Sequence, residues 1–112
     1  MIQEFYDMLL KACSQRATGY LRIMSGLVGC NITRSRDHFA KICRAYIAQT
    51  LSKEGFSDRM IARCMGCSRS NIYLLKKENT TGIAGIAAAF NKRKYDVQFE
   101  SNPRAVKMGG CL

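Results

Sequence analysis

Basic and polar side chains that could recognise nucleic acid are concentrated in residues 68–77, which read SRSNIYLLKK. Arg69 offers a fork of N–H donors that matches the two acceptors of a guanine edge and discriminates by about 1–3 kcal/mol. Ser70 and Asn71 can bond a phosphate, and Asn71 can also bond an adenine edge. Tyr73 can stack on a base, contact a thymine methyl group or bond a phosphate. Together these residue types favour a nucleic-acid interface.

Further cations around this stretch could hold a phosphate backbone. We expect a major-groove or phosphate contact from Lys77, and phosphate contacts from four other cations: Arg36, Lys41, Arg59 and Lys76. Any one of them could equally be an ordinary solvated side chain. As a group they coincide with the charge surplus, because residues 34–77 hold 10 Lys and Arg against 3 Asp and Glu, in a chain of net charge +10. Such an imbalance favours nucleic acid first and an anionic membrane second.

Metal and catalytic chemistry are poorly supported by the residues. Cys64 and Cys67 have the spacing of half a zinc site, but the chain has one histidine, His38, and no second close cysteine pair. A catalytic site needs a nucleophile, a base and a pocket, and no motif supports a cysteine nucleophile acting with His38. There is also no GxxxxGK[ST] phosphate loop. We therefore expect no metal, no cofactor and no enzymatic activity.

The elements that must position these side chains lie in residues 58–77, which predict two short helices on either side of a sharp turn. Ala62 is small enough for close helix packing, and Gly66 provides the turn, where a positive φ is cheap without a side chain. Ser68 is expected to cap the second helix, with Ile72 and Leu75 facing inward. The outward residues are then Ser68, Arg69, Ser70, Tyr73, Leu74 and Lys77. This is the pattern of a helix-turn-helix.

A longer helix is expected before this pair. Thr33 or Ser35 is predicted to cap it, and its apolar face continues to about Lys53. Gly55 can take the left-handed conformation that ends a helix. We expect Phe56 to pack back on the core, and residue 57 or 58 to cap the next helix.

The N-terminal residues, about 2–15, place apolar side chains at steps of three and four, which predicts a helix with one apolar stripe. That stripe must be buried, either in the domain or in a homodimer. Glycines at 19, 26 and 29 interrupt residues 16–31, so a broken or short helix, or a connector, is expected there.

After Asn79 the sequence predicts an accessory helix, capped by Thr80 or Thr81 and reaching about Lys92. Alternating apolar side chains at 95, 97 and 99 suggest a short strand-like run, and residues 101–112 suggest a loose tail. At 112 residues we expect one all-α domain over 1–112, with its helix-turn-helix core at about 33–78.

Compartment can be inferred from the cysteines and the N-terminus. The first residues carry early acids and no long apolar run, unlike a signal peptide, and no stretch reaches the roughly 20 apolar residues of a membrane span. We therefore expect a cytoplasmic protein without membrane contact. Its six cysteines are expected to be reduced and to serve mostly as small apolar fillers.

Residues from about 33 to 77 resemble the DNA-binding C-terminal domain of the bacterial replication initiator DnaA, a Trp-repressor-like helix-turn-helix variant with a long preceding helix and a basic loop. The loop TRSR is the matching basic loop, and the resemblance implies that Arg34 reaches into the minor groove. The family reads its target with Asp-His-Thr-Thr, where this chain has Ser68, Arg69, Ser70 and Asn71. The resemblance therefore implies the docking mode and not the target.

The sequence as a whole predicts specific binding of double-stranded DNA, in transcription regulation or DNA replication, without ATPase activity. Two alternatives use the same helices: a protein–protein interaction module, in which the charge only aids solubility, and an RNA binder.

Overall fold

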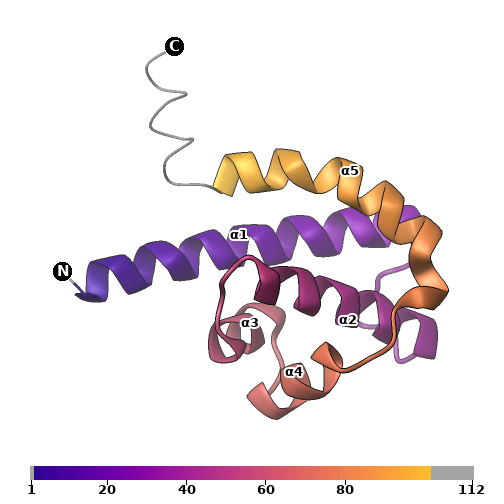
Figure 1. Cartoon of the computed structure of the whole chain (residues 1–112), viewed down its shortest axis with the longest axis horizontal. Helices are drawn as coiled ribbons and strands as arrows, with labels where there is room; N and C mark the ends of the chain where they lie inside the picture. The colour runs from indigo at the N-terminus through magenta and orange to yellow at the C-terminus, as the bar shows by residue number, and fades with distance from the viewer. Residues whose placement is uncertain (1, 102–112) are drawn as a thin grey trace.

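A computed structural model describes residues 2–101 (Figure 1). The chain forms α1 (Ile2–Val28), α2 (His38–Lys53), α3 (Asp58–Met65), α4 (Arg69–Lys76), a 3-10 turn η1 (Thr81–Ile83) and α5 (Ala84–Ser101). These residues contain no strand, which confirms the predicted all-α class. The predicted tail, apart from Ser101, lies outside the described residues.

The break expected after residue 15 is absent, so that prediction was wrong: α1 runs without interruption to Val28. Gly19 has a packing role in it: an ideal Cβ at this position would lie 2.7 Å from Cγ1 of Val97 in α5. The missing side chain lets α5 lie directly on α1. The helix ends at Gly29, whose φ is +76° and whose N–H bonds to the Ser25 carbonyl at 2.9 Å.

The strand-like run expected at residues 95–99 was also wrong, because these residues are helical: α5 continues past Lys92 to Ser101. Figure 1 shows α5 lying along α1 in the opposite direction. Val97 packs on α1, whereas Tyr95 and Phe99 are 64% and 63% exposed. Residues four apart share one helix face and the residue midway between them points away, so three alternating side chains suit a helix as well as a strand.

An edge-to-face aromatic cluster joins α1, α2 and α5 in the core. The Tyr20 and Phe90 ring centroids are 5.2 Å apart, and those of Tyr46 and Phe90 are 5.7 Å apart. Tyr46 also donates a hydrogen bond of 3.0 Å to Oδ1 of Asn91 on α5. The cluster fixes α5 against both α1 and α2.

Glu54, the residue that ends α2, connects the same three helices with its carboxylate. It accepts hydrogen bonds from the Tyr20 hydroxyl at 2.8 Å and from Gln98 Nε2 at 2.6 Å, and it forms an ion pair with Arg16 at 2.9 Å. Burial and this carboxylate raise the pKa of Tyr20 above its ordinary value. The tyrosine therefore stays a neutral donor.

Candidate nucleic-acid interface

The α3–α4 pair has the predicted local structure. Ser57 begins α3, and its hydroxyl accepts a hydrogen bond from the Met60 amide at 3.2 Å. Gly66 ends α3 with a φ of +72°, and Ser68 begins α4, where it accepts from the Asn71 amide at 3.1 Å. Both serines satisfy amides that have no partner within their own helix. The turn therefore has a defined geometry.

The inward and outward faces of α4 agree with the prediction. Ile72 and Leu75 are buried, and Ala62 of α3 is buried on the same side. The predicted outward residues are all exposed: Ser68, Arg69, Ser70, Tyr73, Leu74 and Lys77. Asn71 is exposed as well. Figure 1 places α4 on the side of the molecule away from α5.

Lys76 and Lys77, the two candidate cations at the end of α4, both have partners within the protein. The Lys76 ammonium lies 2.7 Å from the Asp58 carboxylate, which connects the end of α4 to the start of α3. The Lys77 ammonium lies 4.1 Å from the centroid of the Tyr73 ring. The two lysines thus differ: Lys76 belongs to the α3–α4 contact, whereas Lys77 and Tyr73 present a combined cation and ring to solvent.

A side chain that sequence reasoning missed, Gln49, holds α4 against α2. Its amide nitrogen donates to the Leu75 carbonyl at 3.2 Å and to the Glu78 carbonyl at 2.9 Å. These carbonyls lie at the end of α4, where helical bonding runs out. A single glutamine on a helix gives no periodic signal, so the sequence offered nothing that could identify this role. Lys41, a predicted phosphate contact, lies 3.7 Å from the Glu78 carboxylate.

The basic loop before α2 is held by Arg44, which sequence reasoning also missed. Its guanidinium donates to the Ile32 carbonyl and, at 2.8 Å, to the Ser35 carbonyl. Arg34 and Arg36 lie on this held loop and are both exposed, and Arg59 on α3 is exposed too.

The predicted cap of α2 was wrong. The helix begins after Asp37, without a side-chain cap bond, and the Ser35 hydroxyl instead accepts from the Asp37 amide at 3.2 Å. Thr33 lies further back in the loop, where its amide bonds to Asn31 Oδ1 at 3.0 Å. Both residues shape the loop that carries the arginines.

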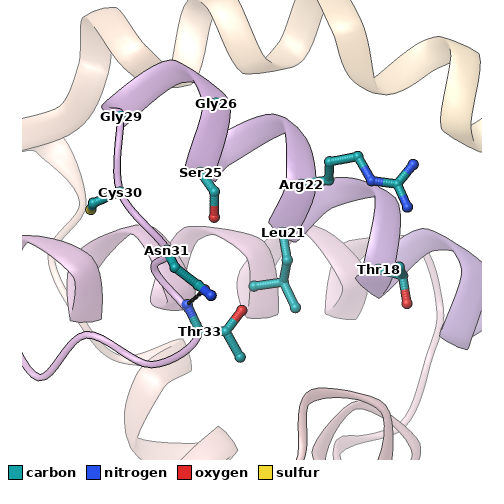
Figure 2. A pocket seen from close by; sticks show the side chains of 9 residues that line it. All are labelled: Thr18, Leu21, Arg22, Ser25, Gly26, Gly29, Cys30, Asn31 and Thr33. Carbon is teal, nitrogen blue, oxygen red and sulfur yellow. Dashed lines mark hydrogen bonds between the residues drawn. The ribbon is translucent and has the colours of Figure 1, made fainter.

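A shallow hollow lies between the last turns of α1 and the basic loop (Figure 2). Thr18, Ser25, Asn31 and Thr33 line it with hydroxyl and amide groups, and Arg22 extends outward from α1 beside them. Donors of this kind next to a cation suit a phosphate oxygen. A second hollow, against α4, is lined partly by Arg69.

The cysteines act mainly in packing within the described residues. Cys13 and Cys43 are fully buried, as their predicted filler role requires. Cys13 lies against Cys64 at the contact of α1 with α3, and burial raises the pKa of the Cys13 thiol, with the neighbouring thiol adding to the effect. Across residues 2–101, no three His, Cys, Asp or Glu side chains gather as a metal site.

Comparison with known proteins adds no relative: no protein-family model matches the chain, and neither the curated proteins nor the solved structures give a match. The resemblance to the initiator's DNA-binding domain therefore stays a prediction from the residues. In the part of the chain that the structure describes, the helices are too short or too polar to cross a bilayer.

Proposed function

We propose that this chain binds double-stranded DNA sequence-specifically, with α3 and α4 as a helix-turn-helix and α4 in the major groove. The role would be regulatory or replication-associated, in the cytoplasm, without ATPase or other enzymatic activity. One observation carries the proposal: the exposed face of α4 gathers Arg69, Ser70, Asn71 and Tyr73, while Ile72 and Leu75 anchor the opposite face.

The position of these residues along the helix supports base reading. In helix-turn-helix proteins the first residues of the second helix contact base edges. Arg69 is the first residue of α4, and Asn71 is the third. Arginine suits guanine and asparagine suits adenine, so these two side chains would supply discrimination. Ser68, Ser70 and the exposed cations would supply phosphate contacts.

The basic loop would contribute a second contact. Arg44 fixes the loop backbone, and Arg34 and Arg36 extend from it into solvent. The resemblance implies a minor-groove contact for Arg34, and Arg36 is suited to a neighbouring phosphate. The salt dependence of binding would then be steep, because each neutralised phosphate releases a condensed counterion.

The test begins with selection of bound duplexes from a random pool, followed by anisotropy titrations with Arg69→Ala. We expect roughly 5- to 150-fold weaker binding of the selected site and a smaller gap between selected and random duplexes, as loss of about 1–3 kcal/mol implies. Arg93→Ala is the matched control, since it removes the same charge from an exposed position on α5, on the far side of the molecule from α4.

An Arg69→Ala protein that binds as tightly and as selectively as the parent would exclude α4 as the reading helix. Equal loss in both arginine variants would indicate a general charge effect instead. Substituting Ala for Lys77 should weaken selected and random duplexes alike and lower the salt dependence, as expected of a phosphate contact.

One feature favours a protein partner on the same helix. Leu74 is 61% exposed on α4 next to Tyr73, and exposed apolar side chains are more typical of protein interfaces than of phosphate contacts. Binding assays with random duplex DNA and random RNA at low salt separate the possibilities. Absence of binding to both would favour the protein-interaction module, and preference for RNA would favour the RNA binder.

A further inference from the structure

The first turns of α1 expose an apolar face that the rest of the described chain leaves uncovered. Ile2 is 88% exposed, Phe5 61% and Met8 47%. Figure 1 shows this end of α1 extending past the other helices. Three neighbouring large apolar side chains on one helix end are unusual for a surface, and such patches mark interaction sites.

The charges beside this face are self-complementary. Glu4 and Lys11 are both exposed and are seven residues apart, so they lie on the same flank of the helix. Two such helices aligned antiparallel would place Glu4 of each copy against Lys11 of the other. A parallel alignment in register would instead place Glu4 beside Glu4 and Lys11 beside Lys11. The pattern thus favours an antiparallel pair of identical helices.

We propose that a second copy of this chain docks here, with the two α1 helices antiparallel about a two-fold axis. Each copy then buries the other's Phe5 and Met8, and two Glu4–Lys11 pairs flank the contact. Because residue 4 of one copy lies level with residue 11 of the other along the helix axis, residue 2 lies level with residue 13. This alignment brings Ile2 near the end of α5, where Phe99 is exposed and shares a hollow with Arg16 of α1.

The same segment is a poor DNA surface. It carries Glu4 and Asp7 against one cation, Lys11, in a chain whose positive charge is concentrated in residues 34–77. Phosphate contacts need cations, so these acids favour a partner that brings its own lysine. Figure 1 places α4 away from this end of α1, so docking would leave the α4 helix of each copy accessible to DNA. Two reading helices related by a two-fold axis would suit a palindromic site, a consequence that rests on the proposed function.

Sedimentation equilibrium of the DNA-free protein over a range of concentrations tests the docking directly. We expect a monomer–dimer equilibrium that Phe5→Gln shifts to monomer, because it removes the largest apolar group of the contact. Phe39→Gln is the matched control, since Phe39 is a phenylalanine that is also exposed (37%) but lies on α2, and it should leave the dimer unchanged. Far-UV circular dichroism checks that both variants remain folded.

The charge pattern tests the alignment. Lys11→Glu or Glu4→Lys alone sets like charges against each other in both flanking pairs and should weaken the dimer roughly 5- to 30-fold at low salt. The double variant with both changes restores opposite charges and should recover most of the affinity. A strictly monomeric parent protein would refute the docking, and single variants that dimerise like the parent would refute the antiparallel pairing. Neither result depends on whether the chain binds DNA.

Discussion

Replacing Gly19 with alanine is the sharpest test of how α5 lies on α1. The new Cβ would lie 2.7 Å and 2.8 Å from the two Cγ atoms of Val97. Carbon atoms in good contact are about 3.5–4.0 Å apart, so the helices must separate by about 1 Å at this point. Val97 cannot turn away easily, because a β-branched side chain in a helix has one strongly preferred rotamer.

Two opposing terms set the magnitude. Overpacking costs about 1–3 kcal/mol, whereas alanine within a helix is favoured over glycine by about 1 kcal/mol. We therefore expect Gly19→Ala to lower the free energy of unfolding by about 1 kcal/mol. Gly26→Ala is the internal control: Gly26 lies in the same helix and its Cβ would meet nothing within 4 Å, so only the propensity gain remains. The two variants should differ by about 2 kcal/mol, with opposite signs relative to the parent.

Urea denaturation followed by far-UV circular dichroism measures both variants. The double variant Gly19→Ala with Val97→Ala should show favourable coupling of about 1 kcal/mol or more, because removal of the Cγ atoms makes room for the new methyl group. If Gly19→Ala stabilises the protein as much as Gly26→Ala does, α5 does not pass over α1 at Gly19. That result would also contradict the packing of Val97 against α1.

Two further predictions concern the groups that hold the scaffold. Gln49→Ala removes two hydrogen bonds to the end of α4 and should cost about 1–3 kcal/mol of stability in the same denaturation assay, with weaker DNA binding as α4 loosens. Tyr20 has a raised pKa in the folded protein, so its contribution to stability is complete below its ordinary pKa of 10.0 and is lost as the pH rises above it. The unfolding free energy of the parent should thus fall above this pH by up to about 1.4 kcal/mol per pH unit more than that of Tyr20→Phe. Equal slopes would show that the hydroxyl keeps its ordinary pKa.

The α3–α4 segment was predictable because its determinants are local. Ser57, Gly66 and Ser68 act on backbone groups within three or four residues of themselves, and the structure confirms each role. The buried side of α4 follows in the same way from the spacing of Ile72 and Leu75. Local rules of this kind need no knowledge of the tertiary fold.

The α1–α5 layer was not predictable in this way because its determinants are far apart in sequence. The low helix propensity of glycine predicts a helix break at Gly19. In the structure Gly19 instead makes room for Val97 of α5, which lies 78 positions later in the sequence. A propensity cost of about 1 kcal/mol is easily outweighed by the burial of a long helix face. The same contact orients Val97 inward and leaves Tyr95 and Phe99 exposed, which the sequence alone could not distinguish from alternation in a strand.

The candidate interface depends on both local and long-range determinants, and substitutions in the two groups should have different effects on DNA binding. Arg69 and Asn71 are placed by the local cap and turn, so changing them should alter DNA recognition and leave folding almost untouched. Arg44 and Gln49 act over longer distances: each donates to backbone carbonyls of another segment, one in the basic loop and the other at the end of α4. If the loop and α4 contact one duplex together, loosening either should weaken binding without changing base preference. If Gln49→Ala changes the base preference instead, the contact with α2 must set the orientation of α4 in the groove.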